Sequence, residues 1–421
     1  MLNLQYLLIF SCSQTAISSW IGVSNIYRLK GLVKLIIPFD RSDSCHHYAT
    51  VEPTVSFEFP QHDSLPESSY TQVIDASSQI PIAKALREYY DDVYKDPRQA
   101  PSTTRPLVDP WLVYSREGKN GQLAPLPGDI DTDKVLSGER DAAGNQIQYS
   151  LKRALCQSFF TPSLYESLLK ELQSLASSVG LTSISNPWLS VYTDGDVQNF
   201  HTDAPHGPLA FVLSLCKNDF DFQGGETILL QPKMLDYFRS FDASRGLEAP
   251  SIIRYIPPRP LGRCIAFDPR VPHGVNRVYG TYQDPRKARV VIHGWFMEPN
   301  ICWFGPWSVT DSSKEMILDN ALNPLIELLA TTDIGRVIGY LAVRLDIEID
   351  GAVSHVRATC DTIVADMDDF RGVIGYDEAD RPIMEDAAAD VRLNIFETLK
   401  NLHFEAGSLP GRYVIVPFSF E

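Results

Sequence analysis

Residues 191–203 read Val-Tyr-Thr-Asp-Gly-Asp-Val-Gln-Asn-Phe-His-Thr-Asp, a strand-like run that ends in His201-Thr202-Asp203. Side chains at positions i and i+2 of a strand point to the same face. The His201 imidazole and the Asp203 carboxylate would therefore converge on one point, as do two of the three ligands of a 2-His-1-carboxylate iron site. The tripeptide alone does not establish a metal site, because His-x-Asp also occurs as solvated or mutually hydrogen-bonded polar residues.

A third candidate ligand and a candidate anchor for an anion follow downstream. Residues 264–267 read as a short buried strand, and the Pro and Gly on either side of His273 mark a turn or a strand edge. Another strand pattern, residues 288–297, has Arg289 near its start. The planar guanidinium of arginine can grip a carboxylate with two parallel hydrogen bonds. His273 would complete the ligand set, and Arg289 would hold a carboxylate beside it.

These motifs, taken in order, resemble those of the iron(II)/2-oxoglutarate-dependent dioxygenases, and in particular the prolyl 4-hydroxylase-like subgroup. The resemblance covers residues 150–300. It is carried by Tyr192, His201-x-Asp203, Gly224-Gly225-Glu226-Thr227, His273, Arg289 and Trp295-Phe296. It implies an α+β protein whose catalytic core is a double-stranded β-helix, a jelly-roll barrel with flanking helices.

The resemblance also implies roles for individual residues. His201, Asp203 and His273 would bind Fe(II) and form the catalytic centre. Arg289 would bind the distal carboxylate of 2-oxoglutarate, and Tyr192 would lie near this co-substrate. Ser214 occupies a position where some relatives carry a tyrosine, so it is a further candidate contact.

The assignment of Arg289 leaves two rivals. Arg289 lies sixteen residues after His273, a longer spacing than is common in the family, and Arg286 and Lys287 are nearby cations. Arg289 is preferred because it stands six residues before Trp295, so the two residues share a strand face.

The enzyme so implied would use Fe(II), 2-oxoglutarate and O2, with ascorbate as a supporting reductant, and release succinate and CO2. It would hydroxylate, or otherwise oxidise, an unactivated C–H bond of a small molecule of amino-acid type. The first alternative is a peptidyl or protein prolyl hydroxylase. The second is a metal-binding barrel or scaffold without enzymatic activity.

Several residues near these motifs are more simply explained by exposed or core positions than by a role in the site. His206 lies between prolines and is expected to be exposed, with a contact to substrate as the alternative. His293 shares the strand face of Arg289, so it either lines the pocket or is a hydrogen-bonded core histidine. Trp188 and Trp295 are expected in the core rather than around a substrate.

Composition excludes some partners. The chain has 421 residues, a formal net charge of −16 and no basic run, so it lacks the electrostatic footprint of a nucleic-acid binder. Its seven cysteines show no metal-binding or disulfide spacing, which favours a reducing, cytoplasmic location. The apolar runs 4–10 and 32–39 are too short to span a bilayer, so a membrane is not expected. A secretory signal or anchor formed by the N-terminal apolar segment is the alternative.

The chain is predicted to divide into four regions. Residues 1–69 form a leader and linker, 70–149 an N-terminal helix over 70–95 and an extended arm, 150–308 the dioxygenase core, and 309–421 a smaller α+β module. Within the core, Thr161 and Pro162 are a good N-cap and first position of a helix. Core strands are expected at 188–193, 209–217, 226–231, 262–268 and 288–297, with a short helix at 234–241.

The module at 309–421 has its own pattern. A helix is expected at 314–330, strands at 337–349, 353–360 and 413–420, and a helix at 386–402. Asp350-Gly351 between the first two strands is a strong hairpin signal. Over residues 335–421 this layout is similar to that of the C-terminal domain of TonB-type proteins. The simpler interpretation is a module that packs on the barrel or forms a dimer interface.

Overall fold

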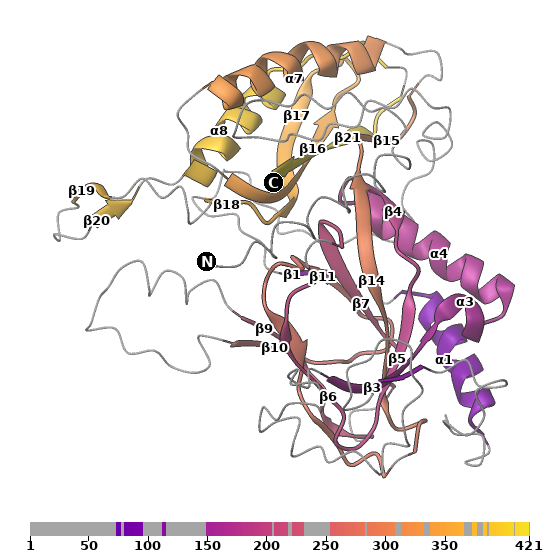
Figure 1. Cartoon of the computed structure of the whole chain (residues 1–421). Helices are drawn as coiled ribbons and strands as arrows, with labels where there is room; N and C mark the ends of the chain where they lie inside the picture. The colour runs from indigo at the N-terminus through magenta and orange to yellow at the C-terminus, as the bar shows by residue number, and fades with distance from the viewer. Residues whose placement is uncertain are drawn as a thin grey trace, which may run out of the picture.

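The protein is a mixed helix-and-sheet molecule with antiparallel sheets (Figure 1). The computed structural model describes residues 73–76, 80–95, 112–114, 149–203, 206–217, 221–230, 253–282, 284–307, 313–331, 337–365, 373–376, 382–384, 387–407 and 409–420. The helix expected at 234–241 and the leader at 1–69 lie outside the described residues.

The strands that surround the motif residues form one hydrogen-bonded sheet of two parts, which we call sheet I and sheet II. Strand β3 (Tyr149–Leu155) belongs to both, because it pairs with β5 of sheet I and with β6 of sheet II. Sheet I has the order β1 (Val73–Ala76), β11 (Cys264–Phe267), β7 (Leu209–Ser214), β14 (Arg289–Pro299), β5 (Trp188–Tyr192), β3. Sheet II continues with β6 (Val197–His201), β12 (His273–Val275), β9 (Thr227–Leu230) and β10 (Ile253–Ile256).

The chain passes repeatedly between the two sheets. It leaves sheet I at β5, enters sheet II at β6, returns at β7, runs through β9 and β10 in sheet II, and then visits β11, β12 and β14 in turn. Shorter strands extend this arrangement: β2 (Leu112–Tyr114) pairs with β3 and β4 (Leu181–Ile184) with β14. β8 (Gln223–Gly224) and β13 (Val278–Tyr279) form a separate two-stranded sheet. The strands predicted for residues 188–297 are confirmed, each within a few residues of the expected ends.

Helices cover the outer face of sheet I: α1 (Ile82–Val93), α3 (Cys156–Phe159) and α4 (Pro162–Ser177) lie on the same side of the molecule (Figure 1). Helix α4 begins as predicted, because the Thr161 hydroxyl accepts a hydrogen bond from the Leu164 amide at 3.5 Å and Pro162 follows it. Its leucine stripe, which includes Leu168 and Leu172, is fully buried in the core beside sheet I. These helices therefore support sheet I from behind.

The helix predicted over residues 70–95 is wrong at its start. Residues 73–76 form β1, which pairs antiparallel with β11, and the helix begins only at Ile82. Burial alternates along β1, with Ile74 and Ala76 facing the core. An edge position on sheet I therefore overrides the helical periodicity of the segment.

A second, five-stranded sheet lies in the C-terminal region. Its order is β15 (Cys302–Phe304), β21 (Arg412–Phe420), β16 (Val337–Ile347), β17 (Val353–Asp361), with β18 (Val364–Ala365) on β16. Helices α7 (Ser313–Thr331) and α8 (Ala387–Lys400) cover one face of it (Figure 1). A separate pair, β19 (Val373–Tyr376) and β20 (Pro382–Met384), follows β18. The predicted helices and strands are observed here, whereas kinship with TonB stays a prediction.

The C-terminal sheet packs on sheet I through its other face. Alternate residues of β16 divide between two cores: Tyr340 and Ala342 join the core of sheet I, and Leu341 and Val343 pack with α7 and α8. The Tyr340 hydroxyl also donates a hydrogen bond to the Val179 carbonyl at 2.5 Å. The boundaries at 150 and 309 stay predictions. Of the helices described, none has the length and apolar character needed to span a membrane.

Candidate active site

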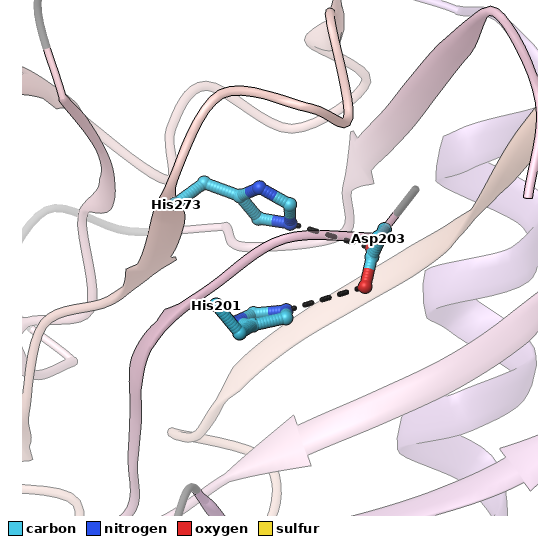
Figure 2. Close-up of side chains that lie close together, drawn as sticks. All are labelled: His201, Asp203 and His273. Carbon is cyan, nitrogen blue, oxygen red and sulfur yellow. Dashed lines mark ion pairs between the residues drawn. The ribbon is translucent and has the colours of Figure 1, made fainter. Parts of the chain in front are cut away.

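The three candidate metal ligands meet where the last residue of β6 lies beside the first residue of β12 in sheet II (Figure 2). His201 ends β6 and His273 begins β12, and the two are direct partners in the antiparallel ladder, with ring centroids 4.4 Å apart. Asp203 follows two residues after His201. Its Oδ1 lies 3.5 Å from His201 Nε2, and its Oδ2 lies 3.3 Å from His273 Nε2. The spacing in the sequence and the strand pairing therefore bring all three side chains to one point.

Hydrogen bonds orient both imidazoles. His201 Nδ1 donates to the Asn199 carbonyl at 2.9 Å, and His273 Nδ1 donates to the Val271 carbonyl at 2.8 Å. A neutral ring that donates from Nδ1 carries its lone pair on Nε2, which is the atom that faces Asp203 in each case.

The donor atoms fit a metal ion. One ligand atom from each residue lies within 4.8 Å of the others. Metal–nitrogen and metal–oxygen bonds of about 2.0–2.2 Å place the ligands of one octahedral face about 3 Å apart, close to the observed distances. Among the described residues, these three form such a cluster.

The protonation states suit metal binding. Burial raises the pKa of Asp203, but the neighbouring His273 and His201 outweigh this effect, so the pKa is lowered overall. Burial, followed by the neighbouring His273, lowers the pKa of His201. At neutral pH the carboxylate is ionised and the His201 ring is neutral, which are the forms that bind a metal.

Gln198, which the sequence did not single out, contacts the ligand cluster. Its amide Nε2 lies 3.0 Å from His201 Nε2 and donates to that lone pair. Its Oε1 accepts a hydrogen bond from the Tyr192 hydroxyl at 3.2 Å. Burial raises the pKa of Tyr192 to about 12, against the lowering effect of Arg289, so this hydroxyl remains a donor at neutral pH. Gln198 thereby connects Tyr192 to the candidate ligand His201.

A cavity of about 890 Å³ lies next to the ligands and is lined from both sheets. Sheet I contributes alternate residues of β14, namely Arg289, Val291, His293 and Trp295, because every second side chain of a strand faces the same side. Sheet II contributes the three candidate ligands and residues near them, including Thr227 of β9. The expectation that Arg289 and Trp295 share a strand face agrees with this arrangement.

Arg289 lies in the cavity wall at 1% exposure. Its Nε donates to the Gly225 carbonyl at 2.6 Å, and its Nη2 donates to the Thr227 hydroxyl oxygen at 3.1 Å. Its Nη1 is buried and has no hydrogen-bond partner among the described residues. A buried cation with an unsatisfied donor is suited to an anionic ligand, and the carboxylate of 2-oxoglutarate fits this role.

Gly225 explains part of the Gly-Gly-Glu-Thr motif. Its φ is +72°, in the left-handed region that glycine adopts without strain, and a Cβ there would lie 2.9 Å from Cδ of Arg289. The backbone therefore approaches the arginine closely, and Thr227 two residues later completes the contact. The sequence identified the motif by resemblance but did not assign it this support of Arg289.

The other predicted co-substrate residues have different outcomes. Tyr192 lines the cavity, with its ring 4.8 Å from the Arg289 guanidinium carbon. Ser214 is buried, but it is not among the residues that line the cavity, and its hydroxyl donates to the Pro258 carbonyl. The rival Arg286 is paired with Asp284 at 3.0 Å, and neither it nor Lys287 lines the cavity.

The two tryptophans expected in the core instead line the cavity and are only half-buried. The guanidinium carbon of Arg153, on β3, lies 4.2 Å from the ring centroid of Trp188, and Arg153 also lines the cavity. Arg153 was missed because no local motif surrounds it. Trp295 is stacked on the exposed ring of His206, with centroids 4.5 Å apart.

The two neighbouring histidines also reach the cavity. His206 Nδ1 donates to the Asp203 carbonyl at 2.6 Å, so this exposed residue contacts the backbone of a ligand. His293 Nε2 lies 2.9 Å from the Ser190 hydroxyl. Burial, with a smaller effect of Arg153, lowers the pKa of His293 to about 3, so its ring is neutral. Both interpretations of His293 therefore hold: it lines the pocket and is hydrogen-bonded.

No protein-family model and no curated protein matches the chain. Solved structures do align with it. The alpha ketoglutarate dependent non-heme epimerase SnoN from nogalamycin biosynthesis is 11% identical, with 54% of this chain and 78% of that chain covered and a TM-score of 0.30. A Pseudomonas putida prolyl-4-hydroxylase is 17% identical, with 47% and 96% covered and a TM-score of 0.23. EctD from S. alaskensis, solved with 2-oxoglutarate and 5-hydroxyectoine, is 13% identical, with 58% and 80% covered and a TM-score of 0.29.

At such identities and TM-scores the alignments do not establish the activity of this chain, so its function is argued from the geometry of the site.

Proposed function

We propose that the protein is an iron(II)- and 2-oxoglutarate-dependent oxygenase, and that sheets I and II form a double-stranded β-helix. The alternation of successive strands between the two sheets supports this fold. The observation that carries the function is the presence, in one cavity, of a His-Asp-His cluster and a buried arginine with an unsatisfied donor.

Under this proposal the residues of the site have distinct roles. His201, Asp203 and His273 would hold the metal through the two Nε2 atoms and the carboxylate. The carbonyls of Asn199 and Val271 keep the rings oriented. When bound, iron(II) and 2-oxoglutarate supply an oxidant from O2 for a substrate C–H bond and release succinate and CO2.

Arg289 would bind the distal carboxylate of 2-oxoglutarate. Gly225 and Thr227 already hold the guanidinium in place, so little ordering is required when the co-substrate enters. The Tyr192 hydroxyl, protonated because its pKa is raised, stays hydrogen-bonded to Gln198 beside the site. Burial of Arg289 excludes water from this end of the cavity.

The substrate we propose is a small molecule of amino-acid type. A cavity of about 890 Å³ lies within the usual range for small ligands, about 300–1,000 Å³. Arg153 lies in its wall, and a guanidinium can bind a carboxylate through two parallel hydrogen bonds. Val212 and Phe267 supply apolar surface for the remainder of the substrate.

A peptidyl prolyl hydroxylase is the second candidate. Phe200 both lines the cavity and is 41% exposed, so the cavity reaches the surface beside the ligand strand β6. A peptide could enter along this opening. A cytoplasmic location, ascorbate dependence and a dimer through residues 309–421 stay predictions from the sequence.

The test is succinate formation by the purified full chain with Fe(II), 2-oxoglutarate and ascorbate. The added compounds are free amino acids, their amides and proline-containing peptides. We expect turnover in the unmodified protein, stimulation by acids rather than amides, and loss of that stimulation in Arg153→Gln with basal turnover retained. Stimulation by peptides alone would favour the second candidate.

The ligand assignment has its own controls. Asp203→Asn is expected to abolish turnover and metal binding, whereas His355→Gln, which changes an exposed histidine of β17 outside the cavity, is expected to retain metal binding. Metal binding without any turnover of 2-oxoglutarate would indicate the non-enzymatic alternative. Equal turnover by Asp203→Asn and the unmodified protein would contradict the proposed site.

A further inference from the structure

The turn between β11 and β12, residues 268–272, contacts two of the three candidate ligands through its backbone. The Pro269 carbonyl accepts a hydrogen bond from the Asp203 amide at 2.9 Å. The Val271 carbonyl accepts one from His273 Nδ1 at 2.8 Å. The position of this turn therefore sets where the Asp203 backbone lies and how the His273 ring is rotated.

Arg270 lies between these two carbonyls and connects the turn to the C-terminal sheet. Its Nε donates to Asp268 Oδ1 at 2.9 Å, and Asp268 is 3% exposed, so the side chain is fixed against the turn itself. Its Nη2 donates to the Thr362 carbonyl at 3.0 Å. Thr362 lies on the connection between β17 and β18 of the C-terminal sheet. The Arg270 guanidinium thus bridges the turn 268–272 and the C-terminal region.

The Thr362 carbonyl is itself held rigidly. The Thr362 amide donates to the Tyr340 carbonyl at 2.7 Å, and the Tyr340 amide donates to the Thr362 hydroxyl oxygen at 3.0 Å. On the other side, Arg392 of α8 donates to Asp361 Oδ2 at 2.6 Å and to the Ile363 carbonyl at 2.7 Å. Strand β16 and helix α8 therefore fix the residues on both sides of the carbonyl that receives Arg270.

We propose that the C-terminal α+β unit is a structural part of the metal site, and that Arg270 is the positioning residue through which it acts. The unit holds the turn 268–272, and the turn in turn holds Asp203 and His273 in their ligand geometry. The inference rests on the proposed metal site. It assigns a role to a region for which the sequence predicted only packing on the barrel or a dimer interface.

The physical reason is preorganisation. A metal binds tightly only when its ligands are held near their final positions, and residues that orient ligands typically change metal affinity by about 10–100-fold when they are removed. Asp203 lies on a connection after β6 rather than within a strand, so it depends on such contacts more than His201 does. The contact with Pro269 is the backbone bond that connects it to the turn.

The test is a titration of the full chain with Co²⁺, a probe that occupies nitrogen and oxygen sites suited to Fe²⁺ and has a visible spectrum. Arg270→Gln is expected to raise the Kd for Co²⁺ about tenfold. Arg270→Lys keeps the positive charge but loses the planar guanidinium. Its Kd should lie between those of the unmodified protein and Arg270→Gln. Arg357→Gln on β17 makes the same chemical change in the C-terminal sheet away from the turn, and it should bind Co²⁺ as the unmodified protein does.

A double-mutant cycle separates this role from a general loss of stability. Thr362→Val removes the hydroxyl that fixes the Thr362 backbone, and Thr362 is not among the residues that line the cavity. It should raise the Kd in the unmodified background and have no further effect in Arg270→Gln, because both substitutions interrupt one connection. If Arg270→Gln does not fold, Arg270→Lys takes its place in the cycle.

The outcomes distinguish the two proposals. Unchanged Co²⁺ affinity in the Arg270 variants, or independent effects of Thr362→Val and Arg270→Gln, would overturn the positioning role while leaving the metal site intact. Co²⁺ binding that survives His201→Ala unchanged would instead overturn the proposed metal site. Melting temperatures of every variant show whether a change in affinity accompanies unfolding.

Discussion

Arg289 on β14 donates a hydrogen bond from Nη2 to the hydroxyl oxygen of Thr227 on β9, at 3.1 Å. This bond crosses from sheet I to sheet II, so the guanidinium is held by both walls of the cavity. Because the arginine is also bound to Gly225 through Nε, its orientation is set before any ligand arrives. The candidate anchor that the sequence placed on β14 therefore depends on β9 as well.

Replacement of Arg289 should weaken co-substrate binding. Arg289→Gln removes charge-assisted hydrogen bonds worth about 1.5–3 kcal/mol, so the KM for 2-oxoglutarate should rise about 10–100-fold. Thr227→Val removes one neutral supporting bond and should raise it about two- to tenfold. Steady-state kinetics of succinate formation measure both. Arg286→Gln is the matched control, and a larger effect there than in Arg289→Gln would transfer the anchor role to Arg286.

Gln198 is expected to compete with the metal. Its amide occupies the His201 Nε2 lone pair at 3.0 Å, so a metal ion must displace it. Gln198→Leu removes this competing hydrogen bond, worth about 0.5–1.5 kcal/mol, and should lower the Kd for Co²⁺ about two- to tenfold. The measurement is a spectroscopic titration, with Gln173→Leu on α4 as the control. Weaker Co²⁺ binding in Gln198→Leu would show that the glutamine supports the site instead.

His293 should make the protein less stable in acid. Its pKa is lowered from 6.5 to about 3 by burial, so between these values the unfolded chain binds a proton that the folded protein does not. Stability is complete above pH 6.5 and falls by about 1.4 kcal/mol for each pH unit below it, until the folded pKa is reached. His293→Gln should reduce this loss in urea unfolding measured from pH 7 to pH 4. His355→Gln, at an exposed position, should not.

The Asp361–Arg392 pair should dominate the stability of the C-terminal unit. Asp361 is fully buried and Arg392 is 6% exposed. Arg392→Met removes the cation from this buried carboxylate and should cost about 3–5 kcal/mol of unfolding free energy. Arg357→Gln breaks a partly exposed pair with Asp346 and should cost about 1 kcal/mol or less. Chemical denaturation of both variants checks the difference, and similar costs would contradict it.

Local signals predicted the elements that depend on neighbouring residues. Helix α4 begins where Thr161 and Pro162 indicated, because an N-cap and a proline act within one turn. The Asp350-Gly351 hairpin follows the same rule, with Gly351 at φ +99°. The predicted start of the first helix was wrong because residues 73–76 form β1, whose hydrogen-bond partner β11 is far away in the chain.

The site shows the same division. The core positions predicted for Trp188 and Trp295 came from residue type alone, and the cavity they line forms only when the two sheets meet. His206 is exposed, as its flanking prolines indicated. Ser214 was inferred by analogy with relatives, but its hydroxyl is bound by Pro258. Arg153 had no signal, because its contact with Trp188 comes from the pairing of β3 with β5. Gln198 lies within six residues of both its partners, Tyr192 and His201, but no motif marks it.

The sequence by itself determined which chemistry this protein can present. Arg289, His293 and Trp295 share a face of β14 because strand side chains alternate with a period of two, and Asp203 lies near His201 because it follows the end of β6 by only two residues. Both relations are local, so they can be read without a structure. The tertiary structure decided what these faces meet: His201 beside His273, Arg289 against Thr227, and Arg270 against Thr362. Such contacts join residues that are distant in the chain, and only the pairing and packing of whole sheets sets them.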